Sequence, residues 1–139
     1  PLPRFAPEHF AVAHGRDSGR YKQFRRGLDE LDQEGVVQVL RRTDRGDQAP
    51  ILAAVGPMQL DVAKARLEGE FGAPTTIDPP RQLVVRETDA EGAGRLARMG
   101  VEILERRSGE RVALFRSDYH VDSVQRDHPD LTLVRLLAG

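Results

Sequence analysis

Short apolar segments and amphipathic helical segments alternate over the first 80 residues, and their order constrains the fold more than any other feature. An extended segment at residues 4–14 comes before a helix whose apolar residues recur at helical spacing, namely Tyr21, Phe24, Leu28 and Leu31. The β-branched run VVQVL, the run ILAAV, a second helix and a short edge strand in APTTIDPP then follow. This β-α-β-β-α-β order predicts an α+β fold built on a ferredoxin-like split β-α-β unit.

Turn and cap residues mark where these two helices begin and end. Ser18 is the expected N-cap of the first helix, and Gly35 is the expected residue that stops it. Gly56 and Pro57 open the second helix, where proline is tolerated in the first turn and where we expect a close approach or a positive φ at the glycine. Gly27 lies on the flank of the first apolar stripe, so we expect a backbone or bulky side chain to pack against it.

The second half repeats the same order in a smaller form. QLVVRE is a strand, and DAEGAGRLARM is a helix capped by Thr88 or Asp89. VEILERRSGERVALF is a hairpin that turns at Ser108-Gly109, DYHVDSVQRDHP is a short helix or turn, and LTLVRLL is a last strand. We therefore expect a first ferredoxin-like unit at residues 1–80 and a second, smaller α+β unit at 81–139.

Composition excludes several classes of protein and site. The chain has no cysteine, which excludes disulfides, thiolate metal sites and cysteine nucleophiles. Its 21 basic residues nearly balance 22 acidic ones, so a nucleic-acid signal must come from local clustering. No apolar run approaches the roughly 18 residues of a membrane span. The start, PLPRFAPEHF, is no signal peptide and lacks an initiator methionine, so we expect a piece of a longer protein.

Motifs of catalysis and cofactor binding are weak or missing. No G-x-x-x-x-G-K-[ST] loop that could hold phosphates occurs. GAGRLA matches a dinucleotide-binding pattern but lies inside an expected helix, so close helix packing explains it better. The four histidines have no zinc-ligand spacing and no adjacent nucleophile; they are His9, His14, His120 and His128. We predict no catalytic residue and no metal site.

The charges of the first helix run against its dipole. Its first turns carry the cations Arg20, Lys22, Arg25 and Arg26. Its last turns carry the anions Asp29, Glu30, Asp32 and Glu34. Each such placement costs roughly 0.3–1 kcal/mol when exposed near a terminus, and Gly27 costs about 1 kcal/mol relative to alanine. Either this is chance charge on a solvated face, or an anionic partner offsets the cost.

The expected topology gathers these cations with others at one end of the domain. The first two strands run in the same direction, so the start of the first helix and the turn after the second strand share that end. The candidate binding residues are Arg16, Arg20, Lys22, Arg25, Arg26, Arg41, Arg42 and Arg45. We expect this end to have a positive potential.

Four segments resemble the C-terminal domain of the bacterial peptide chain release factor 3 family: RFAPEHF, KQFRRGLDELDQEGVVQV, ILAAVGPMQLDVAKARLEGEF and RDHPDLTL. The patterns K-Q-x-x-x-G-L, E-G-x-x-Q-V and A-V-G-x-x-Q-x-D-V occur in the family's order and spacing. Two departures occur in the second half. The family's A-R-W-V is replaced by RQLVV, without tryptophan, and the region around GAGRLARMG is compressed.

The resemblance implies a translation termination factor. Its GTPase domain and β-barrel domain bind and hydrolyse GTP, and the whole protein drives class-one release factors off the ribosome. For this chain it implies a cytoplasmic, non-catalytic C-terminal domain that needs no cofactor of its own. The implied partners are ribosomal RNA and ribosomal proteins, the GTPase and β-barrel domains of the parent chain and, indirectly, class-one release factors, with no membrane. RNA phosphates are then the implied anionic partner of the cation cluster.

A second function is compatible with the expected fold. Paired β-α-β-β-α-β units also form ACT-like regulatory domains that bind small molecules. Such a sensor would be stabilised by an amino acid, by about 2.7 kcal/mol at a hundredfold excess over its Kd. Thermal shift with a panel of amino acids separates the two functions.

Overall fold

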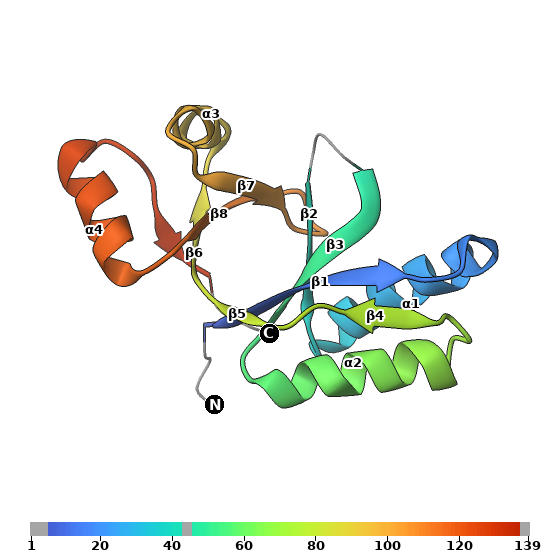
Figure 1. The fold of residues 1–139 in the computed structure, drawn as a ribbon. Coiled ribbons are helices and arrows are strands. Elements are labelled where there is room, and N and C mark those ends of the chain that lie inside the picture. Colours follow the sequence, from blue (N-terminus) through green and yellow to red (C-terminus); the bar gives the residue numbers. More distant parts are fainter. Residues whose placement is uncertain (1–5, 43–45, 137–139) are drawn as a thin grey trace.

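The computed structural model describes residues 6–42 and 46–136, with residues 46–48 described by their backbone only, and it shows an α+β fold (Figure 1). The elements of the first half are β1 (His9–Gly15), a 3₁₀ turn η1 (Ser18–Arg20), α1 (Tyr21–Glu34), β2 (Gln38–Arg42), β3 (Gly46–Ala54), α2 (Pro57–Gly69) and β4 (Thr75–Ile77). The elements of the second half are β5 (Arg81–Gln82), β6 (Val84–Thr88), α3 (Ala90–Arg98), β7 (Glu102–Glu105), β8 (Arg111–Phe115), α4 (Asp118–Asp127) and β9 (Val134–Arg135).

The strand order confirms the predicted fold class. The first half is ordered β4-β1-β3-β2, and the second half repeats this as β9-β6-β8-β7. The strands β2 and β7 pair through Arg41 and Glu105, so the two halves share one sheet. All strand pairs among the described residues are antiparallel. The boundary between residues 80 and 81 stays a prediction.

The sheet curls back on itself into a ring. β5 pairs with β1 and leads into β6 with only Leu83 between them. The strands β1, β3, β2, β7, β8 and β6 therefore form a circuit that β5 closes, as Figure 1 shows. In the same view α1 and α2 lie outside the ring on one side, and α3 and α4 lie outside it on the other.

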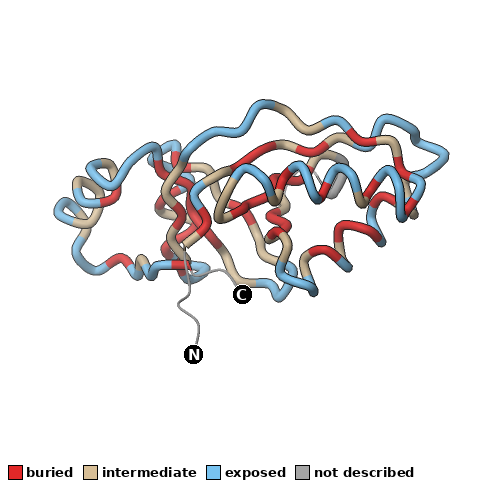
Figure 2. The backbone as a smooth tube through the Cα atoms, turned by 90° about the horizontal axis from the view of Figure 1, so that it is seen from below, coloured by how far each residue is buried: buried red, intermediate tan, exposed pale blue. Residues whose placement is uncertain are grey.

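Residues of the ring strands alternate between two buried faces. On β1, Phe10 belongs to a cluster shared by all the ring strands, whereas Ala11 packs beneath α1 and α2. On β8, Leu114 joins the shared cluster and Phe115 packs beneath α3 and α4. The shared cluster is Phe10, Leu40, Ile51, Ala53, Val85, Leu104, Val112, Leu114 and Leu136. Figure 2 shows buried residues along these strands and exposed residues on the outer turns of the helices.

The first helix forms on its predicted apolar stripe, but its start differs from the prediction. Phe24, Leu28 and Leu31 are buried, and Gly35 ends α1 with φ 80°. Ser18 is not the cap. The carboxylate of Asp17 accepts the Gly19 N–H at 2.9 Å and caps η1, because the chain makes a 3₁₀ turn before α1 begins. Arg20 is left at the N-cap of α1 without a side-chain cap hydrogen bond.

Gly56 corrects another expectation. Its φ is −136° and its backbone is extended, because it is the N-cap residue that precedes Pro57 at the start of α2. Its N–H donates to Gln59 Oε1 at 3.1 Å. An added Cβ would meet only that same oxygen, at 3.0 Å, which is the end of a flexible side chain. The positive φ that we predicted is therefore wrong, and so is a close backbone approach.

Side-chain caps also position the helices of the second half. Of the two predicted caps of α3, Asp89 accepts the Gly92 N–H at 2.7 Å. The GAGRLA run lies within α3, and a Cβ on Gly92 would collide with the Thr88 hydroxyl. The glycine therefore allows α3 to lie close to the end of β6. Ser117 caps α4 by accepting the His120 N–H at 3.1 Å.

Candidate nucleic-acid interface

Five of the eight candidate cations lie around the start of α1. β1 and β2 both pair antiparallel with β3, so they run in the same direction and end on the same side of the sheet. Arg16 follows β1, Arg20 ends η1, and Lys22, Arg25 and Arg26 lie exposed on α1. Arg45 lies outside the described residues.

Arg41 and Arg42, which the sequence analysis also placed in this cluster, lie on β2, and each forms an ion pair within the fold. Adjacent residues on a strand point to opposite faces, and here each guanidinium has an acidic partner. Arg41 lies toward α1 and donates to Asp29 Oδ1 at 3.2 Å. Arg42 lies on the other face and donates to Glu102 Oε1 at 3.1 Å, which links β2 to β7. Both arginines hold elements of the fold together.

Arg16 has one acidic partner and remains largely exposed. Its Nη2 donates to Glu68 Oε2 at 3.1 Å, and 56% of its side chain is accessible to solvent. A guanidinium has five N–H donors, so this single hydrogen bond leaves donors for another group. Arg16 can therefore support a binding surface without being its main contact.

Three exposed cations at the start of α1, Arg20, Lys22 and Arg26, have no ion pair with any residue in the described part of the chain. We call these residues the α1 cation triplet. No acidic side chain lies in the first turn of α1 to neutralise it. Charge and helix dipole therefore have the same sign here, and an anion is attracted by both.

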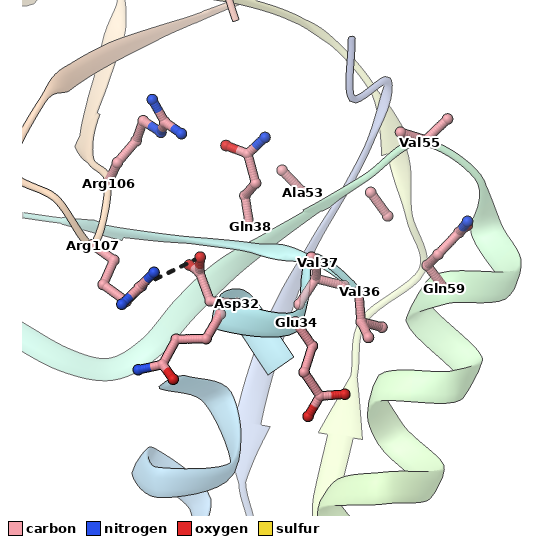
Figure 3. Close-up of a pocket in the computed structure, with 13 residues that line it drawn as sticks. Asp32, Glu34, Val36, Val37, Gln38, Ala53, Val55, Gln59, Arg106 and Arg107 are labelled. Atoms are coloured by element: carbon pink, nitrogen blue, oxygen red, sulfur yellow. Dashed lines mark ion pairs between the residues drawn. The ribbon is translucent and has the colours of Figure 1, made fainter. Parts of the chain in front are cut away.

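Three of the four anions at the end of α1 have partners within the fold, and the exposed Glu30 has no ion pair with a described residue. Asp32 accepts the Val39 N–H at 2.8 Å and pairs with Arg107 at 3.5 Å (Figure 3). Glu34 is held by two hydrogen bonds from Arg66, at 2.7 and 2.9 Å. These hydrogen bonds keep the pKa of Glu34 below its ordinary value. Ion pairs within the fold thus reduce the free-energy cost of the anions at the C-terminal end of α1, but not that of the cation triplet at its N-terminal end.

A cavity of about 350 Å³ lies at this acidic end, where α1, β2 and the β7–β8 turn meet (Figure 3). Arg106 and Arg107 line it from the turn, and both already have acidic partners, Glu87 at 3.9 Å and Asp32. Our sequence analysis did not single out these two arginines. The only signal was the pair of adjacent cations in ERRSGE, and the partners of that pair lie far away in the sequence.

Gly27 lets α1 and α2 lie close together below the cation triplet. An added Cβ would stand 2.7 Å from Leu67 Cδ2 and 2.9 Å from the Phe71 ring. Both side chains are buried, with exposed fractions of 0% and 7%. The absence of a side chain at Gly27 therefore allows the short distance between α1 and α2.

The metal-ligating side chains of the described residues lie scattered. Among them, no group of three or more histidine, cysteine or acidic side chains could hold a metal ion. His14 lies 3.1 Å from Asp78, and His120 packs edge-on against Phe115. No helix in the described part of the chain is long and apolar enough to cross a membrane.

Comparison with known proteins points to one family. Residues 1–125 match the family described as "Class II release factor RF3, C-terminal domain". Peptide chain release factor 3 of Synechocystis sp. is 38% identical over 138 residues, which cover 96% of this chain and 25% of that protein. The protein of the same name from Synechococcus elongatus is 36% identical over 137 residues, covering 95% and 24%. The chain thus spans about a quarter of the length of these curated relatives.

Proposed function

Because this chain belongs to the family of class II release factor RF3 C-terminal domains, we propose that it is the ribosome-binding domain of a translational GTPase and that its α1 cation triplet contacts RNA phosphates. In this proposal the parent protein binds and hydrolyses GTP in a separate domain, which a β-barrel domain follows. It acts in the cytoplasm, where it removes class-one release factors from the ribosome after termination. The chain itself is non-catalytic and needs no cofactor.

The observation that carries the proposal is the unequal neutralisation of α1. Of the four anions, Asp29, Asp32 and Glu34 have partners within the fold and Glu30 does not, whereas none of the three cations of the triplet has an ion pair with a described residue. Phosphates placed at the triplet would offset its charge and the helix dipole together. Phosphate contacts position a protein on RNA without reading its sequence, so we expect binding that depends on salt and little on sequence.

Charge reversal of the triplet tests this proposal. We expect the variant with Arg20→Glu, Lys22→Glu and Arg26→Glu to bind bacterial ribosomes more weakly in co-sedimentation over a series of salt concentrations. The slope of log affinity against log salt should fall by about 1 for each phosphate that the variant no longer binds. Arg42 stays unchanged in this variant because it pairs with Glu102, and Arg25 because it has other interactions within the fold.

A matched variant controls for net charge. Arg98, Arg116 and Arg126 are exposed in the second half and have no ion pair with a described residue. Reversing these three changes the charge equally and should leave ribosome affinity and salt slope close to those of the unmodified chain. Equal losses of affinity in both variants would show that only net charge matters. If the triplet variant instead bound ribosomes with unchanged affinity and salt slope, the reversed polarity of α1 would have no role in binding.

A further inference from the structure

An open cavity of about 740 Å³ lies where β1 ends and η1 begins, at the start of α1. Its lining includes His14, Arg16, Asp17, Ser18 and Tyr21. This volume is within the range of small-molecule sites, roughly 300–1,000 Å³. Arg16 is the cation that lines the cavity, and Arg20 and Lys22 precede and follow Tyr21 in the sequence without lining it.

Two aromatic rings line this cavity, and contacts within the fold restrain both. Tyr21 is half-buried and packs against the core beneath α1. His14 is held by Asp78, with 3.1 Å between the ring nitrogen Nε2 and Oδ2. Unpaired bases of RNA stack on aromatic side chains, because every base has a π-face. A restrained ring that lines an open cavity is suited to such a planar group.

The polar groups of the cavity match a nucleoside better than a bare phosphate. In the described part of the chain, neither the Ser18 hydroxyl nor the Tyr21 hydroxyl has a hydrogen-bond partner. Asp17 uses Oδ1 for the Gly19 N–H, and no other described residue donates to its carboxylate. A carboxylate repels phosphate but accepts hydrogen bonds from sugar hydroxyls and base amino groups.

We propose that this cavity receives one unpaired nucleotide of RNA. The base stacks on Tyr21, the ribose hydroxyls bond to Ser18 and Asp17, and one adjoining phosphate lies against Arg16, from which the RNA backbone continues toward the α1 cation triplet. The 2′-hydroxyl gives the site a group that distinguishes RNA from DNA. This inference rests on the proposed function and adds to it a site for a base, beyond the phosphate contacts.

Tyrosine fluorescence provides a direct test. The chain has no tryptophan and two tyrosines, Tyr21 and Tyr119, and Tyr119 is 76% exposed on α4. A Tyr119→Phe variant leaves Tyr21 as the only emitting residue. A short oligouridylate should quench its emission, whereas an oligonucleotide of the same length without bases should bind through its phosphates and leave the emission unchanged. Uridine monophosphate alone should quench only at much higher concentration, and the deoxyribose oligonucleotide should bind more weakly.

Affinities of matched variants complete the test. Tyr21→Leu should weaken oligouridylate binding about fivefold or more, and Tyr21→Phe should retain most of it because the ring remains. Tyr119→Leu, the matched control on α4, should leave the affinity unchanged. Salt-dependent binding without quenching of Tyr21, or equal affinity of Tyr119→Phe for RNA and DNA, would overturn the nucleotide site while leaving the proposed phosphate contacts intact. Absence of any salt-dependent binding, to oligonucleotides and to ribosomes, would overturn both proposals.

Discussion

Gly27 is a residue whose local cost is explained only by a contact from another element. Glycine inside a helix costs about 1 kcal/mol relative to alanine, so the position is unfavourable for α1 alone. The side chains of Leu67 and Phe71 occupy the space where a Cβ would stand, with distances of 2.7 and 2.9 Å to the missing atom. Both are buried, so neither can move aside into solvent.

We expect Gly27→Ala to destabilise the chain despite its better helix propensity. Overpacking a tight contact costs about 1–3 kcal/mol, which exceeds the propensity gain of about 1 kcal/mol and leaves a net loss of roughly 1 kcal/mol. Urea denaturation measures this change. Gly94→Ala in α3 is the matched control, because the added Cβ would meet only Arg98 Nη1 at 3.7 Å, and it should stabilise. If both variants stabilise, the contact of Gly27 with α2 is incidental.

At the scale of elements, α1 and α2 are joined at their exposed ends by one arginine. Arg66 of α2 donates to Glu34 at the end of α1 and to Glu70 just after α2. These hydrogen bonds hold the pKa values of both carboxyls below the ordinary value and raise the pKa of Arg66. An anion at the C-terminal end of a helix is unfavourable, so this partner makes Glu34 acceptable there.

The lowered pKa values predict how this contact depends on pH. A carboxyl with a lower pKa in the folded state stabilises the fold above its unfolded value, here near 4.5, and loses that contribution as pH falls through the folded value. Arg66→Gln should therefore reduce stability at neutral pH and narrow the difference in urea midpoint between pH 7 and pH 3. The control Arg98→Gln removes an exposed arginine without an ion pair among the described residues and should leave that difference unchanged. Equal pH dependence in both variants would show that solvent screens the Arg66 contacts completely.

At the scale of the whole molecule, two helix-covered half-sheets close around one shared core. The pairing of β2 with β7 and of β5 with β1 brings together Leu40, Ile51 and Leu104 in the cluster that all the ring strands share. Arg42–Glu102 and Arg107–Asp32 add ion pairs between the halves. The strands of both halves therefore form one ring with helices outside it on two sides. The α1 cation triplet lies on one of these helices.

The isolated chain should neither bind nor hydrolyse GTP. Its sequence has no loop that could place backbone amides and a lysine around phosphates. Fluorescent GTP-analogue titration and phosphate release measure the two activities. Hydrolysis that co-purifies with the chain through successive columns, and disappears on denaturation of the chain, would contradict the assignment of GTP chemistry to a separate domain.

Local patterns in the sequence predicted most of the elements of this protein. The apolar stripe of α1, its stop at Gly35, the turn at Gly109 and the order of strands and helices all depend on residues close together in the chain. For the same reason the excess of cations at the start of α1 was visible without a structure. The predicted cap at Ser18 was wrong because the neighbouring Asp17, which is also a good cap residue, accepts the hydrogen bond instead. The predicted positive φ at Gly56 was wrong because this residue is an N-cap with extended backbone.

Tertiary structure alone decided which charges remained available and how the halves joined. Arg42, a candidate binding residue, pairs with Glu102, and Arg107, which the sequence did not single out, pairs with Asp32. In both pairs the partner lies far away in the sequence. The pairing of β5 with β1, which closes the ring, joins a two-residue strand to a partner near the start of the chain. Such pairings depend on the packing of whole faces rather than on local periodicity. They could be seen only once the chain was folded.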